Sequence, residues 1–183
     1  VAMFMGCTFN AMNIISEKED GIALINEILP MTPRQYVVQK IFVGFVFGFL
    51  SAMVTAAICF RLSHEGMAAM LVLTVLSAFV AALVGLFVGR ISEGMMAGVV
   101  YIKIVMIVFM AVPLLKYLAV AENKALSAIC YFVPSSATFE GVMDLANGGM
   151  AAAGKDMVIL AVHCAGWFLL YLLLSRHRKK HSF

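Results

Sequence analysis

Residues 16–40, SEKEDGIALINEILPMTPRQYVVQK, form a polar and charged stretch between two apolar runs of the chain. Ser16 and Glu19 have the S-x-x-E spacing of a capping box, in which hydroxyl and carboxylate each satisfy a free backbone N–H. A helix is therefore predicted to begin at Ser16. Behind it, apolar residues recur at helical spacing and acidic or amide residues take the other face, which predicts an amphipathic helix on a surface. The apolar positions are Ile22, Leu24, Ile25, Ile28 and Leu29.

A second helix is predicted to follow directly. Pro30 ends the first helix, because the residue before a proline is pushed out of the α region. Thr32 can cap the next helix, and Pro33 suits its first position, where no N–H is needed. Gln35 completes another capping box. This second helix is expected to continue through Lys40 into the apolar run that follows.

The composition indicates an integral membrane protein. Of the 183 residues, 63% are hydrophobic and 13% charged, against roughly 45–50% and about 25% in soluble domains. Several spans of about 20 residues fit this length and leave little room for a soluble domain, so any energy source must come from a partner. The net charge is only +3, and the basic residues are not gathered with stacking aromatics, so nucleic-acid binding is not expected.

The apolar runs predict an all-α membrane protein, a polytopic helical bundle in a single transmembrane domain over residues 1–183. Residues 1–15 are short of a full span and are predicted to be the end of a membrane helix. Since the chain opens on Val1 in mid-run, we expect a C-terminal fragment that lacks its first membrane helix. Further membrane helices are predicted over residues 41–60, 67–89, 95–120 and 157–174, with a basic tail over 175–183.

Three G-x-x-x-G pairs predict close helix packing, because glycine lets two helix backbones approach. They are Gly44 and Gly48, Gly85 and Gly89, and Gly94 and Gly98.

Residues 126–147 are expected to stay on one side of the membrane. The apolar stretch LSAICYFV has only eight residues before Pro134, too few for a hydrocarbon core of about 30 Å. A re-entrant or interfacial helix is therefore predicted before the last span. Ser135 and Ser136 offer caps for a short amphipathic helix that Gly148 and Gly149 end. Its expected apolar face holds Phe139, Val142, Met143 and Ala146, opposite Glu140 and Asp144.

Polar side chains inside the apolar runs are candidates for a transport pathway or for packing. Lys103 either lines a pathway or extends its ammonium to the membrane surface. His163 is expected to hydrogen-bond between helices, with a pathway role as the alternative. Glu140 and Asp144 are the remaining pathway candidates, and Pro113 is expected to kink its helix.

The motifs of catalytic and metal sites are missing from the sequence. Cys7, Cys59, Cys130 and Cys164 are widely spaced in apolar runs, so neither a disulfide framework nor a metal site is expected. The stretch GMAAAGKD, residues 149–156, has the G-x-x-x-x-G-K spacing of a phosphate loop, but aspartate replaces the Ser or Thr that would hold magnesium. With no nucleophile elbow and no His pair, no catalytic site is predicted.

The order of features in residues 16–40 resembles the cytoplasmic coupling segment of type-2 ABC transporter permeases. An acidic E-K-E-D-G start, L-P-x-T-P and R-Q-Y-x-x-x-K lead into a membrane helix. The resemblance implies that this segment docks on an ATP-hydrolysing subunit. It assigns that coupling role to Glu17, Glu19, Asp20, Gly21, Leu24, Ile25, Leu29, Pro30, Thr32 and Pro33. The broken helix before the last span is similar to the outer re-entrant helices that seal the exit side in that family.

The resemblance implies a permease subunit of an exporter that moves a hydrophobic or amphipathic substrate, such as a drug or lipid, by alternating access. ATP and magnesium would bind to the partner ATPase, and a second permease copy or a homologue would complete the assembly in a bacterial plasma membrane. A cytoplasmic coupling segment and C-terminus agree with the positive-inside rule. The alternative is a small membrane scaffold or channel-like protein without ATPase coupling. On the predicted inner side lie eight basic residues, Lys18, Arg34, Lys40, Arg90, Arg176, Arg178, Lys179 and Lys180, against four outside, Arg61, Lys116, Lys124 and Lys155.

Overall fold

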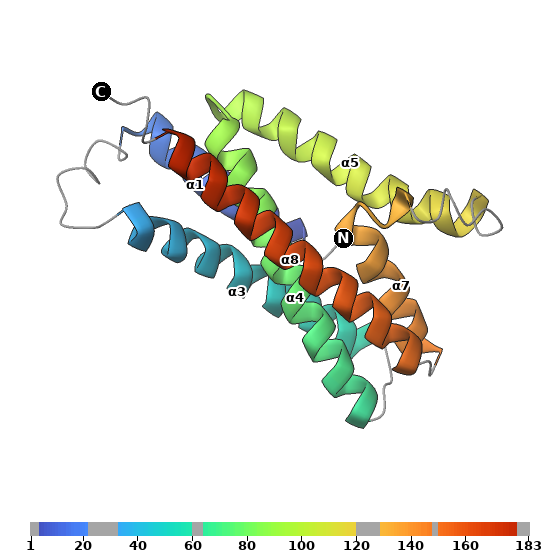
Figure 1. The fold of residues 1–183 in the computed structure, drawn as a ribbon. Helices are drawn as coiled ribbons and strands as arrows, with labels where there is room; N and C mark the ends of the chain where they lie inside the picture. The colour runs from blue at the N-terminus through green and yellow to red at the C-terminus, as the bar shows by residue number, and fades with distance from the viewer. Residues whose placement is uncertain (1–3, 22–32, 60–63, 120–128, 148–149, 179–183) are drawn as a thin grey trace.

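The computed structural model describes residues 4–21, 33–59, 64–119, 129–147 and 150–178, which form an all-helical bundle (Figure 1). Within these residues, four helices (α3, α4, α5 and α8) are long and apolar enough to cross a membrane. The bundle confirms the predicted polytopic all-α architecture. Its helices are α1 (Phe4–Glu19), α3 (Pro33–Cys59), α4 (His64–Ile91), α5 (Met95–Ala119), α7 (Pro134–Ala146) and α8 (Met150–Arg178).

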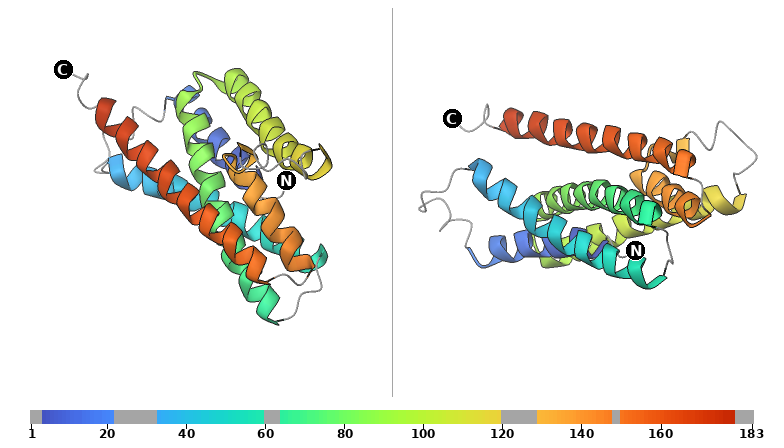
Figure 2. Two further views of the ribbon diagram at one scale, coloured as in Figure 1. Left: turned by 45° about the vertical axis from the view of Figure 1, so that its right-hand side comes forward. Right: turned by 90° about the horizontal axis from the view of Figure 1, so that it is seen from below.

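Helix α4 is the centre of the bundle. It contacts α1, α3, α5, α7 and α8, and Figure 2 shows it running between α1 and α8. In the most apolar stretch of α4, 61% of the residues are buried within the bundle, against 22% or less in the corresponding stretches of α3, α5 and α8. A helix that is hydrophobic on all sides must be covered on all sides by other helices or by lipid, and α4 is covered mainly by helices. The other three spans keep broad apolar surfaces outside the bundle.

The three glycine pairs share one partner, α1. A Cβ atom added to Gly6 of α1 would lie 2.7 Å from the Gly48 Cα atom of α3, and one added to Gly85 of α4 would lie 2.5 Å from the Cys7 carbonyl oxygen of α1. One added to Gly98 of α5 would overlap the Ile15 side chain. Because only glycine leaves room for these contacts, α1 lies in a groove formed by α3, α4 and α5.

The end of α1 differs from the prediction. Helix α1 passes through Ser16 and ends at Glu19, so the expected helix start at Ser16 is wrong. The Ser16 hydroxyl donates to the Asp20 carboxylate at 3.1 Å instead of capping a helix. The reason is that residues 4–15 are already helical, so the N–H groups after Ser16 have carbonyl partners one turn back. Gly21, with φ of +68°, follows the helix in the left-handed conformation that commonly ends helices.

The second predicted helix of the stretch is present. Helix α3 begins at Pro33 and runs without interruption to Cys59. The middle of the predicted coupling segment, residues 22–32, lies outside the described residues, and with it Leu24, Ile25, Leu29, Pro30 and Thr32.

Helix α7 starts earlier than the serine pair suggested. Val133 is its N-cap residue and Pro134 occupies its first turn, so the predicted capping by Ser135 and Ser136 is wrong. The ring of Pro134 explains the start, because proline has its φ angle already set for a helix and needs no N–H partner there. Both serine hydroxyls are buried without a hydrogen-bond partner.

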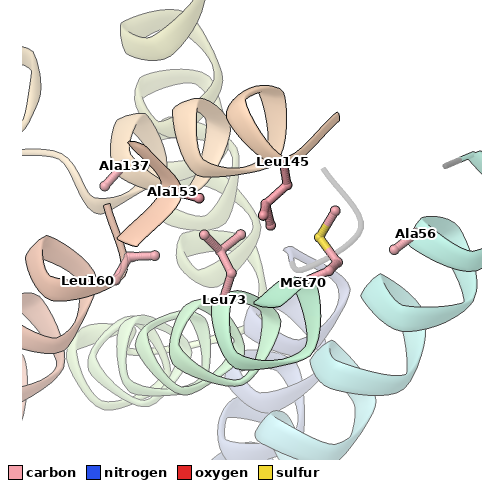
Figure 3. Packing of buried hydrophobic residues seen from close by; sticks show 7 residues of the cluster. All are labelled: Ala56, Met70, Leu73, Ala137, Leu145, Ala153 and Leu160. Carbon is pink, nitrogen blue, oxygen red and sulfur yellow. The ribbon is translucent and has the colours of Figure 1, made fainter. Parts of the chain in front are cut away.

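The buried side of α7 also differs from the predicted apolar face. Ala137 and Leu145 belong to one buried cluster with Met70 and Leu73 of α4, in which Leu145 lies toward Met70 and Ala137 toward Leu160 of α8 (Figure 3), whereas Ala146 is exposed. Val142 of the predicted face packs against the same cluster. Ala137 was missed because alanine carries little hydrophobic signal, although small residues let α7 approach its neighbours closely.

Helix α8 begins at Met150, ahead of the predicted residue 157. The alanines of residues 151–153 are the strongest helix formers and extend the helix toward its N-terminus. Residues 150–156 are therefore helical, which excludes the loop that a phosphate-binding G-x-x-x-x-G-K motif requires.

Candidate functional site

A cavity of about 580 Å³ lies between α1, α3, α4, α5, α7 and α8, and it opens to the outside of the bundle beside Met106, Met110 and Leu114, which are exposed. Its volume is within the roughly 300–1,000 Å³ of sites for small organic ligands. Most of its wall is apolar, and the side chains that line it in the described residues carry no charge. The hydroxyl side chains in this wall are Thr55, Thr74, Ser77, Ser135 and Thr138.

Small and irregular residues create this cavity. Ala52 and Ala56 of α3 face it with short side chains, so the space between α3 and α4 is not filled there. Pro113 lies inside α5 and also lines the cavity. Proline removes one backbone hydrogen bond of a helix and favours a bend there, and the kink of α5 stays a prediction from the sequence. A moving or bent α5 therefore changes the shape of the cavity directly.

A charged cluster ties α5 to α7 beside the cavity. Lys116 of α5 forms an ion pair with Glu140 of α7, and the Tyr131 hydroxyl donates to the other Glu140 oxygen. The Lys116 ammonium also lies 3.3 Å from the centroid of the Tyr131 ring. Burial, the hydrogen bond with Glu140 and the negative charge of Asp156 raise the pKa of the Tyr131 phenol above its usual range. Tyr131 therefore stays protonated and keeps donating to Glu140.

At the opposite end of the bundle, two adjacent residues of α1 hold the turn between α4 and α5. Lys18 donates to the Gly89, Arg90 and Ser92 carbonyl oxygens at 2.7, 2.8 and 3.1 Å. The Glu19 carboxylate accepts a hydrogen bond of 2.6 Å from the Met95 N–H, the first of α5. A cation at a helix C-terminus and an anion at an N-terminus are both the favourable choice for the helix dipole.

A second set of contacts joins the same end of α1 to α3. Lys40 forms an ion pair with Glu17 and donates to the Asn13 side-chain oxygen. The Tyr36 hydroxyl donates to Glu17 at 2.9 Å. The carboxylates of Glu17 and Glu19 are thus both occupied within the chain. In the interior, Asn10 donates to the Ala82 carbonyl of α4 at 2.9 Å.

The four pathway candidates from the sequence lie outside the cavity wall. Lys103 is exposed on α5. His163 places one ring nitrogen 2.9 Å from the Ile159 carbonyl oxygen of its own helix and the other 3.2 Å from that of Phe132, in the turn before α7, so its contact outside α8 is with a turn and not with the helix that the sequence predicted. Glu140 belongs to the ion pair with Lys116, and Asp144 is half-buried on α7.

The hydroxyl residues of the cavity carried no signal in the sequence. Thr74 and Ser77 stand in an apolar run without motif spacing, and Thr138 is one of several polar residues in the stretch PSSATFEG, residues 134–141. Only their shared position between α4 and α7 makes them a group. Among the described residues, no three His, Cys, Asp or Glu side chains gather as a metal site requires.

A family model described as "ABC-2 family transporter protein" matches residues 1–173. Neither the curated proteins nor the solved structures gave a match to the chain. The family match covers nearly the whole sequence and agrees with the four candidate spans. The chain therefore belongs to the ABC-2 transporter family, as a multi-pass integral membrane permease of the type-2 ABC class.

Proposed function

We propose that this chain is the permease subunit of an ATP-driven exporter, and that a hydrophobic or amphipathic cargo passes through its internal cavity. A separate ABC ATPase binds and hydrolyses ATP with magnesium. The permease works as a pair with a second copy or a homologue. Its coupling segment and C-terminus face the cytoplasm of a bacterial cell, in the orientation that the distribution of basic residues favours.

The observation that carries the proposal is the attachment of α1 to the turn between α4 and α5. Lys18 holds the last carbonyls of α4, and Glu19 holds the first N–H of α5. Because the predicted coupling segment continues from this end of α1, force on that segment would reach α4 and α5 together. Both helices line the cavity, so a rigid-body shift of the pair would change its shape and access.

The proposed roles within residues 16–40 divide into two groups. Glu17 and Glu19 use their carboxylates on Lys40 and on the Met95 N–H, so we assign them to transmission of force inside the permease. Docking on the ATPase then falls to the rest of the segment, with Asp20 and Gly21 at its start and Pro33 at its end. The other docking residues proposed are Leu24, Ile25, Leu29, Pro30 and Thr32.

Co-purification with an ABC ATPase from the source organism tests the partnership. In liposomes, the joint complex is expected to hydrolyse ATP faster when apolar cargo is added. A Lys18→Met/Glu19→Gln double variant should still bind the ATPase and hydrolyse ATP, but the stimulation by cargo should fall. A membrane scaffold would retain no ATPase on purification and show no stimulation, and that result would refute the proposal.

A further inference from the structure

We propose that the cavity binds an uncharged, drug-sized molecule with an apolar body and one hydrogen-bond donor, which is received by the Ser77 hydroxyl oxygen. This inference rests on the proposed function, since the same cavity would hold the cargo during export. It goes further by naming the charge and the hydrogen-bonding polarity of that cargo.

The absence of charge in the wall selects neutral molecules. The cavity lining in the described residues holds no acidic or basic side chain. The ammonium of Lys116, which does not line the cavity, is neutralised by the carboxylate of Glu140 in their ion pair. An ion that enters a low-dielectric site without a counter-charge loses its hydration and gains no partner. Charged analogues of a bound neutral molecule should therefore bind at least about tenfold more weakly.

The hydrogen bonds between hydroxyl groups in the cavity wall favour a ligand that carries a hydrogen-bond donor. Thr138 has a single hydroxyl proton, and it donates this proton to the Pro134 carbonyl oxygen at 3.1 Å. We therefore assign Ser77 as the donor in the contact of 2.9 Å between the Ser77 and Thr138 hydroxyls. With its proton used, Ser77 presents only oxygen lone pairs to a ligand. A molecule with an O–H or N–H group satisfies this acceptor, whereas an ether oxygen meets a second acceptor.

Two further features fit such a ligand. The Ser135 hydroxyl is buried without a hydrogen-bond partner and belongs to the same wall, so it can complete the polar contact. Met70, Met106 and Met110 supply unbranched, polarizable side chains around the apolar body. The cavity volume of about 580 Å³ accommodates two or three rings and excludes a polymer chain.

Photo-crosslinking with a matched set of benzophenones tests the inference. The probes are 4-(hydroxymethyl)benzophenone, its methyl ether, 4-(aminomethyl)benzophenone as the cation and 4-benzoylbenzoate as the anion. The full chain is labelled in lipid nanodiscs, and mass spectrometry measures labelling at Met70, which lines the cavity and is buried from the lipid-facing surface of the bundle. The alcohol should label Met70 roughly fivefold more than the ether, since one hydrogen bond distinguishes them. Both charged probes should label it at least about tenfold less than the alcohol.

Two variants separate hydrogen-bond polarity from simple packing. Ser77→Ala removes the hydrogen-bond acceptor, so labelling of Met70 by the alcohol should fall to the level of labelling by the ether. Thr138→Val takes away the acceptor of the Ser77 proton, so Ser77 becomes a donor and labelling by the ether should rise. Thr8→Val, on α1 and outside the cavity wall, is the matched control and should change neither probe.

Equal labelling of Met70 by the alcohol and the ether in the unmodified chain would overturn the donor assignment, and strong labelling by either ion would overturn the charge assignment. The experiment needs no ATPase, so failure of coupling and failure of this inference give different results.

Discussion

Removal of Glu140 should cost more stability than removal of Lys116, because the two partners of their ion pair are buried to different degrees. The Lys116 side chain is 8% exposed and the Glu140 side chain 30% exposed. Glu140→Gln therefore leaves a buried ammonium that only the Tyr131 ring still compensates. Lys116→Met leaves a carboxylate with partial access to solvent and with the Tyr131 hydroxyl still donating to it.

These exposures set the expected magnitudes. Removing one partner of a buried ion pair costs about 3–5 kcal/mol, and we expect about 3 kcal/mol for Glu140→Gln because the cation–π contact remains. Lys116→Met should cost about 1–2 kcal/mol, the range for a partly exposed polar group that loses one contact. The double variant Lys116→Met/Glu140→Gln leaves no buried charge of the pair and should cost about 1 kcal/mol. The coupling energy between the two positions is then about 3–4 kcal/mol.

Thermal unfolding in detergent, followed by circular dichroism, measures these differences. A change of about 1 kcal/mol shifts Tm by about 2–4 °C for a chain of this size, so Glu140→Gln should lower Tm by roughly 6–12 °C. The double variant should recover most of this loss. Additive effects of the two single substitutions, or a larger loss from Lys116→Met than from Glu140→Gln, would refute the reasoning from burial.

Single contacts elsewhere in the bundle give three more expected outcomes. Gly85→Ala should lower stability by about 1–3 kcal/mol, because its Cβ would lie 2.5 Å from the Cys7 carbonyl oxygen. The control Gly166→Ala, with no atom within 4 Å of the new Cβ, should be neutral or stabilising by up to about 1 kcal/mol in the same unfolding assay. Glu19→Gln should destabilise the chain by about 0.3–1 kcal/mol, because it removes a negative charge at the α5 N-terminus. High salt should reduce this stability difference between the variant and the unmodified chain, and a difference that salt does not change would contradict a dipole effect. The raised pKa of Tyr131 means that its contribution to stability is present below its ordinary pKa of 10.0 and is lost as the pH rises beyond that value. Tyr131→Phe should therefore flatten the decline of Tm above that pH, and an identical slope in both proteins would exclude this tyrosine as the cause.

Much of the architecture could be predicted from hydrophobic length alone. A run of about 20 apolar residues has few options other than a membrane helix, because its backbone groups must be satisfied within the segment. The ends of helices were less predictable, because a capping motif can also occur inside a helix that simply continues through it. The Ser16 and Glu19 pair has the spacing of a helix start, yet α1 was already formed ahead of it.

The candidate site was harder to predict than the fold, because its members come from separate helices. Sequence reasoning selected charged residues such as Lys103, since a charge in an apolar run stands out. The cavity is instead lined by neutral residues such as Ser77 and Thr138, whose hydroxyls meet only when α4 and α7 pack together. The three glycine pairs were visible in the sequence, but their common partner α1 was not.

The sequence by itself determined that this chain is a multi-pass helical membrane protein with a polar segment near its start, because composition and run length fix how the chain partitions into a bilayer. Only the tertiary structure decided which helix occupies the centre, where the cavity lies and what Lys18 and Glu19 contact. These properties depend on pairs of residues far apart in the chain, such as Glu19 and Met95. No local pattern records such a pairing, since it arises from the packing of whole helices against one another.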